Sequence, residues 1–215
     1  MQGLGTAAWP GRAQRLALPR CPAITLHLDG AHTALSMGEV GLWYRESLRG
    51  LAGGAAAGAG LLPVPVLVFY CGVDKPAEAL LAVLAATAPW AQVHLVGGVG
   101  EESGGEGGVA RARARCAALQ EAWVGACSSA CSAGGKAQVP EGASCWAEWL
   151  EKEEGGGGGG GGGGIHPAPF LHDSLDCALR QIERSCSGGA QVLVTGSLYL
   201  VGEALLAARS GSSKG

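Results

Sequence analysis

The chain has few Phe and Tyr residues for its size and almost no net charge. Its 215 residues include two Phe, three Tyr and six Trp, and the formal net charge is −3. A nucleic-acid-binding domain usually carries a clear excess of Lys and Arg, so this balance argues against polyanion binding and predicts no nucleic-acid partner. The hydrophobic fraction of 47% is enough for a core, although much of it is alanine.

Long apolar runs and export signals are also lacking. No stretch reaches the roughly eighteen consecutive apolar residues of a membrane helix, so we expect no membrane partner. The N-terminus shows none of the basic, apolar and cleavage regions of a secretory signal. The eight Cys follow no repeating spacing, which favours reduced thiols over a disulfide framework.

Several motifs of known chemistry are absent from the printed sequence. It contains no Gly-x-x-x-x-Gly-Lys-Ser/Thr phosphate loop and no Gly-x-Ser-x-Gly elbow, so a hydrolase triad has no support. His166 and His172 are six residues apart, and Cys127 and Cys131 have no partner pair. We therefore predict no metal site within this chain.

What the chain does contain is an alternation of apolar strands and amphipathic helices. The pattern predicts strands over 24–28, 64–70, 93–96 and 191–195, and helices over 36–48, 77–86, 173–185 and 198–208. A Gly/Ala connector is expected over 50–62. Strands that alternate with helices are typical of an α/β fold, here a three-layer, mostly parallel sheet with flanking helices.

The middle of the chain breaks this alternation. Glycine is frequent throughout, 39 of 215 residues, and 155–164 is an unbroken glycine run. Helices are possible over 109–124 and 144–154. We predict a single domain over 1–208, with 97–165 as a disordered or loosely structured insertion and 209–215 as a disordered tail.

An acid and an imidazole follow the first predicted strand. Asp29 and His32 lie where the strand gives way to a helix that Thr33 is placed to cap. In open α/β sheets, ligands bind beyond the carboxyl ends of the strands. Asp29 is suited to accept hydrogen bonds from a ribose or adenine, or to serve as a turn or capping residue. His32 is suited to bind a ligand, to act as an acid or base, or to be structural.

Two other segments carry candidate residues. Arg12 follows Gly11 in a predicted loop, where a guanidinium is suited either to clamp phosphate oxygens or to be solvated. Ser197 follows the strand over 191–195 in a Thr-Gly-Ser turn, a weak phosphate-loop pattern. Asp74 and Lys75 follow the strand over 64–70, and we assign them no role.

Taken in order, three motifs resemble the C-terminal domain of folylpolyglutamate synthase, a member of the Mur ligase superfamily. They are Trp-Pro-Gly-Arg at 9–12, Leu-Asp-Gly-Ala-His-Thr at 28–33, and the segment 192–202. Residues 66–75 also fit that domain's second strand and the loop after it. The resemblance is dense over 9–96 and 170–208 and weak between them. It implies a Rossmann-like Mur ligase C-terminal fold.

The resemblance also implies a function. The family joins L-glutamate to tetrahydrofolate in one-carbon metabolism, using ATP and an acyl phosphate. This chain would be the C-terminal lobe of such an ATP-dependent ligase, incomplete by itself. The resemblance assigns the nucleotide contacts to Arg12 and Asp29, and it places Ser197, a further cofactor-binding candidate, in a turn that lines the interdomain cleft. His32 is the catalytic candidate because of its position on the first turn of the helix.

The resemblance implies partners and a compartment as well. Folate and L-glutamate would be the substrates, and ATP and Mg the cofactors. The Mg ligands and the phosphate loop are expected on the N-terminal ATPase domain of the same enzyme. A cytoplasmic or mitochondrial location is usual for the family.

Two alternatives stay open. The chain is either a lobe or truncated fragment of a ligase, or a non-catalytic α/β binding or interaction module that lacks the phosphate loop and is inactive alone. An unrelated small-molecule-binding domain would require the ordered motifs to be coincidental.

Overall fold

The computed structural model describes residues 9–55, 63–100, 107–132 and 166–210, and within them six strands form one sheet. The strand order is β1-β2-β6-β3-β4-β5, and all neighbours are parallel except β1, which is antiparallel to β2. The strands are β1 (Gln14–Leu18), β2 (Cys21–Leu28), β3 (Val64–Phe69), β4 (Gln92–Val96), β5 (Phe170–His172) and β6 (Ala190–Thr195). The predicted mostly parallel sheet is confirmed.

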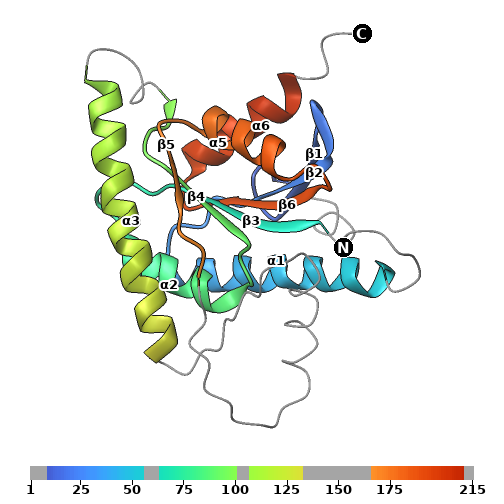
Figure 1. Ribbon diagram of the computed structural model, residues 1–215, viewed down its shortest axis with the longest axis horizontal. Helices are drawn as coiled ribbons and strands as arrows, with labels where there is room; N and C mark the ends of the chain where they lie inside the picture. The colour runs from blue at the N-terminus through green and yellow to red at the C-terminus, as the bar shows by residue number, and fades with distance from the viewer. Residues whose placement is uncertain (1–8, 56–62, 101–106, 133–165, 211–215) are drawn as a thin grey trace, which may run out of the picture.

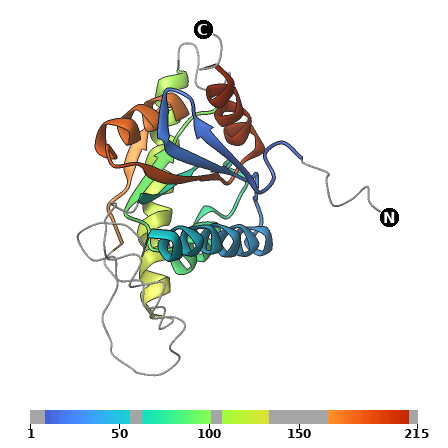
Figure 2. The same ribbon diagram turned by 90° about the vertical axis from the view of Figure 1, so that its right-hand side faces the viewer.

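Helices cover both faces of the sheet (Figures 1 and 2). On one face lie α1 (Ala34–Ala55) and α2 (Ala77–Thr87), and α3 (Gly108–Ser132) packs against α2 and the β4–β5 edge. On the other face lie α5 (Leu175–Ser185) and α6 (Leu198–Ser210). Each face has its own buried apolar cluster, so the predicted three-layer arrangement is confirmed.

The central strands are apolar at nearly every position because both of their sides are covered. In β3, Leu67 and Phe69 join the cluster under α1 and α2, while Val66 and Val68 join the cluster under α5 and α6. All six residues of β6 are buried. Continuous apolar runs of this kind are typical of parallel strands with helices on both faces.

Side-chain caps fix the starts of two helices. At α1, the Ser36 backbone N–H donates to the Thr33 hydroxyl oxygen, and the Thr33 N–H donates to the Ser36 oxygen, both over 3.2 Å. This reciprocal pair confirms Thr33 as the predicted cap. At α5, the Ser174 side chain accepts from the Cys177 N–H. Both caps satisfy backbone donors that have no partner inside the helix.

Three elements differ from the sequence prediction. No element was predicted over 14–18, which forms the edge strand β1, and the short strand β5 was not predicted either. Helix α1 continues to Ala55, through residues 50–55 that were assigned to a connector. Edge strands are partly exposed and lack a continuous apolar run, which explains why the pattern missed them.

Part of the predicted insertion is folded. The helix expected over 109–124 is present and longer, and its Leu119, Trp123 and Ala126 are buried in the cluster under α1 and α2. The prediction that 97–165 is loose is therefore wrong for α3, because a helix that buries a tryptophan belongs to the core. Residues 133–165, including the glycine run and the possible helix over 144–154, lie outside the described residues.

At the C-terminus, α6 extends to Ser210, two residues into the predicted tail, and residues 211–215 lie outside the described part.

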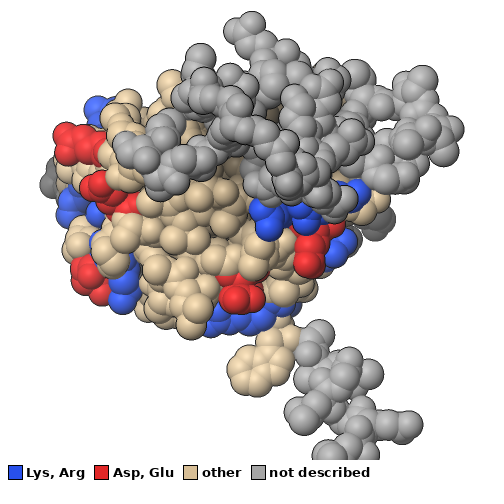
Figure 3. All heavy atoms as spheres, turned by 90° about the horizontal axis from the view of Figure 1, so that it is seen from below, with Lys and Arg blue, Asp and Glu red and all other residues tan. Residues whose placement is uncertain are grey.

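In the view from below, acidic and basic side chains lie near one another around a largely uncharged centre (Figure 3). Among the described residues, no helix is long and apolar enough to cross a membrane. Among the residues whose side chains the structure describes, six cysteines are free thiols: Cys21, Cys71, Cys116, Cys127, Cys177 and Cys186.

The burial of α3 generates a stability prediction. The Trp123 side chain is 2% exposed, and its Nε1–H donates to the Pro167 carbonyl over 3.1 Å. We expect Trp123→Ala to lower the free energy of unfolding by about 3–5 kcal/mol, because it leaves a cavity and an unpaired carbonyl. Urea unfolding followed by circular dichroism measures this change.

The neighbouring residue is the matched control. Val124 is 58% exposed on the same helical turn, and Val124→Ala should change the free energy of unfolding by less than about 0.5 kcal/mol. Equal small effects of the two substitutions would show that α3 is not part of the cooperative core.

Candidate functional site

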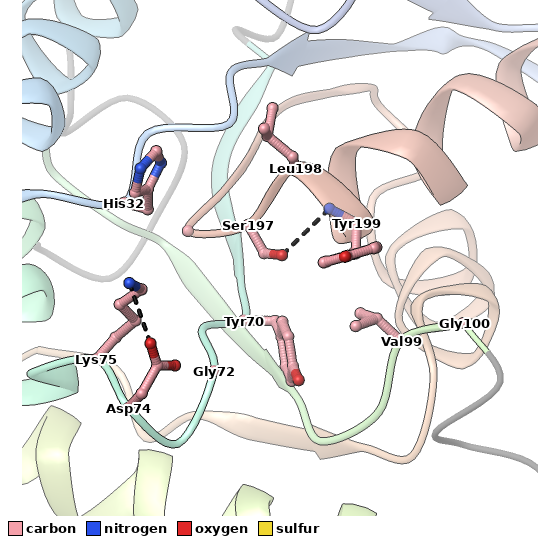
Figure 4. A pocket seen from close by; sticks show the side chains of 11 residues that line it. His32, Tyr70, Gly72, Asp74, Lys75, Val99, Gly100, Ser197, Leu198 and Tyr199 are labelled. Carbon is pink, nitrogen blue, oxygen red and sulfur yellow. Dashed lines mark hydrogen bonds and ion pairs between the residues drawn. The ribbon is translucent and has the colours of Figure 1, made fainter.

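The loops that follow four parallel strands meet at one edge of the sheet and surround a pocket of about 690 Å³ (Figure 4). They follow β2, β3, β4 and β6. The lining residues are His32, Tyr70, Gly72, Asp74, Lys75, Val99, Gly100, Gly196, Ser197, Leu198 and Tyr199. The pocket therefore lies beyond the carboxyl ends of the strands, where open α/β sheets bind ligands.

The topology explains why this edge is hollow. The chain leaves β6 towards α6 on one face, but it leaves the neighbouring strands β2 and β3 towards α1 and α2 on the opposite face. Connections that diverge to opposite faces leave a crevice between them. The crevice here opens at the end of β6, between the loops that carry His32 and Lys75.

The Trp-Pro-Gly-Arg motif at 9–12 forms a tight turn. The Arg12 N–H donates to the Trp9 carbonyl over 3.1 Å, and Gly11, at the third turn position, has a φ of +75°. Proline at the second position and a positive φ at the third are typical of a type II turn. A Cβ on Gly11 would lie 2.6 Å from Val201 Cγ1, so the turn packs directly on α6.

The Asp29 carboxylate joins this turn to the end of β2. It accepts from the Ala13 N–H over 2.9 Å, and Arg12 Nη1 lies 3.4 Å from its other oxygen. The Asp29 side chain is 11% exposed and that of Arg12 is 43% exposed. The carboxylate thus holds the turn over 9–12 against the end of β2, while the guanidinium remains accessible to a ligand.

His32 has a defined tautomer because of its backbone partner. Its Nδ1 lies 2.9 Å from the Gly30 carbonyl oxygen, which is only an acceptor, so Nδ1 carries the hydrogen. The neutral ring therefore has an unprotonated Nε2. His32 is exposed and lines the pocket, so a hydrogen-bond donor in the pocket has access to this nitrogen.

Ser197 caps α6 and lines the pocket. Its hydroxyl oxygen accepts from the Tyr199 N–H over 3.2 Å, which leaves its own hydrogen available for a ligand. Gly196, just before it, has a φ of +99°, and a Cβ there would lie 2.2 Å from the Tyr70 carbonyl oxygen. Only glycine allows β6 to end so close to β3.

An ion pair that received no role from the sequence also borders the pocket. Lys75 Nζ lies 3.1 Å from Asp74 Oδ2, and this hydrogen bond lowers the pKa of the Asp74 carboxyl. Both side chains are exposed, so the pair contributes little to stability. Lys75 faces the side of the pocket opposite Tyr199 (Figure 4). It offers a positive charge to an anionic ligand.

Helix α3 holds this loop through Arg115. The guanidinium donates to the carbonyl oxygens of Cys71 and Gly72, the latter over 2.8 Å, and it also contacts Cys71 Sγ. Burial raises the pKa of the Cys71 thiol, although the nearby Arg115 charge opposes the rise. No sequence pattern pointed to Arg115, because its partners are backbone atoms 43 and 44 residues away.

The structure brings the candidate residues together in two pairs. His32 and Ser197 line the pocket, whereas Arg12 and Asp29 contact each other beside it. Gly30 connects the pairs, since its carbonyl contacts His32 and its N–H donates to Gly11 over 3.1 Å. Tyr70, Val99 and Tyr199 complete the lining and were not singled out by the sequence. The described residues contain no cluster of three or more His, Cys, Asp or Glu that would hold a metal ion.

The fold and the pocket at the strand ends define the class as an α/β domain with a pocket at one edge of a mostly parallel sheet. Comparison with known proteins adds that 82 residues are 40% identical to the mitochondrial folylpolyglutamate synthase of Homo sapiens. A stretch of 83 residues is 37% identical to the mitochondrial folylpolyglutamate synthase of Bos taurus. The human match covers 38% of this chain, the bovine match 39%, and each covers 13% of the relative. The predicted resemblance is confirmed over that part, and no family model matches the chain.

Solved structures of two bacterial folylpolyglutamate synthases are also similar. The bifunctional folylpolyglutamate synthase/dihydrofolate synthase of Yersinia pestis CO92 is 19% identical, with a TM-score of 0.43 over 96% of this chain and 32% of that one. The folylpolyglutamate synthase of Mycobacterium tuberculosis, complexed with ADP and AMPPCP, is 16% identical, with a TM-score of 0.44 over 96% and 34%. A further bifunctional enzyme structure holds Mn, AMPPNP and L-glutamate.

The close approach of Gly196 to Tyr70 generates a second prediction. We expect Gly196→Ala to lower the free energy of unfolding by about 2 kcal/mol or more, because the methyl group meets a backbone oxygen and the positive φ is strained. Gly202→Ala is the control, since a Cβ at this α6 position meets nothing within 4 Å. It should stabilise the protein by up to about 1 kcal/mol.

Thermal and urea unfolding of the two variants give both values. A Gly196→Ala variant as stable as the wild type would contradict the described contact between the ends of β6 and β3.

Proposed function

We propose that this chain is the C-terminal lobe of an ATP-dependent folylpolyglutamate synthase, which joins L-glutamate to tetrahydrofolate. The sequence similarity to the human enzyme over 82 residues is the observation that supports this most strongly. The fold adds to it, because the predicted motif residues, far apart in sequence, gather at one edge of the sheet. The proposed class is an acid–amino-acid ligase in which this chain supplies part of the site.

The residues present fit a nucleotide at this edge. We assign Arg12 to the phosphates, because its guanidinium is partly exposed and held in place by a tight turn. Asp29 is assigned to the ribose or adenine, through the carboxylate oxygen that faces Arg12. When bound, ATP supplies the phosphoryl group that activates the folate carboxylate. The ion pair with the Asp29 carboxylate holds the Arg12 guanidinium beside the position proposed for the phosphates.

His32 and Ser197 are assigned to the glutamate side of the site. The unprotonated Nε2 of neutral His32 is suited to accept a hydrogen bond from the glutamate amine, or to take its proton. The Ser197 hydroxyl is suited to donate to a glutamate carboxylate, while α6 directs its N-terminus toward the pocket. Lys75 adds a positive charge on the opposite side of the pocket.

Phosphate-loop and magnesium chemistry are assigned to another part of the enzyme. The printed sequence has no phosphate loop, and the described residues offer no metal cluster. We therefore propose an N-terminal ATPase domain as the partner, with folate and L-glutamate as substrates and Mg held by that domain. We also propose a cytoplasmic or mitochondrial location for this protein. The names of the human and bovine relatives, which include the word mitochondrial, support the second of these.

A complementation assay tests the proposal. The chain is added to human folylpolyglutamate synthase from which the matching 82-residue stretch and its surrounding lobe have been removed. ATP- and glutamate-dependent extension of tetrahydrofolate is then measured. We expect activity to return with the wild-type chain. It should fall at least about tenfold with Arg12→Lys, because lysine lacks the guanidinium that binds two phosphate oxygens at once, and with Asp29→Asn, because the amide lacks the carboxylate charge.

The matched control is Arg180→Ala, which removes an exposed arginine that is paired with Asp176 on α5 and does not line the pocket. This variant should complement as well as the wild type. Loss of activity in Asp29→Asn without loss of thermal stability separates a ligand contact from the structural role of this carboxylate. A folded wild-type chain that restores no activity would instead favour a non-catalytic α/β module.

A further inference from the structure

The loop after β3 reaches the pocket as a tight turn. The Lys75 N–H donates to the Gly72 carbonyl oxygen over 3.1 Å, and Gly72, Asp74 and Lys75 all line the pocket (Figure 4). A Cβ on Gly72 would lie 2.6 Å from Asp74 Oδ1, so the Asp74 side chain folds back over the turn. The position of the Lys75 ammonium group therefore depends on the geometry of this turn.

One carbonyl group of the turn has two donors. The Gly72 oxygen that accepts from the Lys75 N–H also accepts from Arg115 Nη2 over 2.8 Å. Arg115 Nε donates to the preceding carbonyl, that of Cys71, over 2.9 Å, and Nη2 lies 3.1 Å from Cys71 Sγ. A guanidinium is planar and holds its donors at fixed angles, so it orients two consecutive carbonyl groups at once.

The helix that carries Arg115 is itself fixed against the sheet. Cys116, the next residue of α3, is buried, and its Sγ donates to the His172 carbonyl of β5 over 3.3 Å. One turn earlier, the Ala112 carbonyl packs so closely on Gly97, just after β4, that a Cβ on Gly97 has no room. The Arg115 guanidinium therefore reaches the turn from an element that is held at two strand ends.

Lys75 keeps donors available for a ligand. Its ammonium group has three N–H donors, and one of them reaches Asp74 Oδ2 over 3.1 Å. The Lys75 side chain is 39% exposed, so the remaining donors are open to an anion in the pocket. Under the proposed function, glutamate brings two carboxylates to this pocket. The Ser197 hydroxyl is assigned to one of them, and Lys75 offers its charge to the other.

We infer that Arg115 is a positioning residue for glutamate binding, which fixes the turn over 71–75 so that the Lys75 ammonium group faces the pocket. The inference rests on the proposed function and extends it to a residue outside the pocket lining. Arg115 also lies within 97–165, where the sequence resemblance is weak. Because Arg115 holds the loop and not the reacting groups, its loss should weaken glutamate binding and spare the chemical step.

The complementation assay supplies the measurement, with glutamate varied at saturating ATP and tetrahydrofolate and with an excess of the chain. We expect Arg115→Gln to raise the KM for glutamate at least about fivefold and to change kcat by less than about twofold. Partial unfolding would instead lower the apparent kcat and leave KM unchanged. Arg113→Gln is the matched control, since Arg113 is exposed on the same helix, and it should leave both values unchanged.

A second variant separates the shape of the guanidinium from its charge. Arg115→Lys keeps the charge and most of the aliphatic stem, but a single ammonium group does not reproduce the separate Nε and Nη2 directions. We expect it to show the same rise in KM with little change in kcat, which also covers the case in which Arg115→Gln does not fold. A wild-type KM in Arg115→Lys would show that the charge alone matters, and it would overturn the inference.

A double-mutant cycle tests whether Arg115 acts through Lys75. Lys75→Gln should raise the KM for glutamate at least about fivefold, and adding Arg115→Gln to it should raise KM by less than about twofold more. A full effect of Arg115→Gln in the double variant, or an unchanged KM in the single one, overturns the inference and leaves the proposed function standing. A folded wild-type chain that restores no activity overturns the proposed function and this inference with it.

Discussion

The last strand of the described chain, β6, lies in the middle of the sheet and forms hydrogen bonds with β2 on one side and β3 on the other. Every residue of it is buried, so both apolar clusters require its presence. Its end carries Gly196 and Ser197, and its neighbours' ends carry Asp29 and Lys75. The pocket thus depends on a pairing between residues more than 120 positions apart, such as Leu193 with Leu67. Folding must close that long loop before the site exists.

The Asp29 carboxylate shows how a candidate ligand contact also holds the scaffold. It binds the Ala13 N–H and faces Arg12, and so it fixes the turn over 9–12 against the end of β2. Arg115 does the same for the loop after β3 from the other side, by donating to two consecutive carbonyl groups. Backbone carbonyls and amides at strand ends have no ladder partner, so side chains that satisfy them also set the shape of the pocket. Rigid support of this kind is what a binding site requires.

Much of the fold was predictable from the sequence. The continuous apolar runs over 64–70 and 191–195 predict strands that are buried on both faces, and Thr33 marks the start of α1. The edge strands β1 and β5 were missed, because a strand with one neighbour has no need of a continuous apolar sequence. The helix over 109–124 was expected as part of a loose insertion, because the sequence on both sides of it is rich in glycine. That its Leu119 and Trp123 are buried in the core was not predicted.

For the site, the sequence by itself determined which residues follow each strand: Asp29 and His32, Asp74 and Lys75, Gly196 and Ser197. Parallel strands end at the same edge, so this order already places those residues together. Only the tertiary structure decided that Arg12 faces Asp29, that Arg115 holds the loop after β3, and that His27 lies under α1 beside Gln191. These contacts join residues 17 to 164 positions apart. They arise from strand register and helix packing, which no local pattern in the chain records.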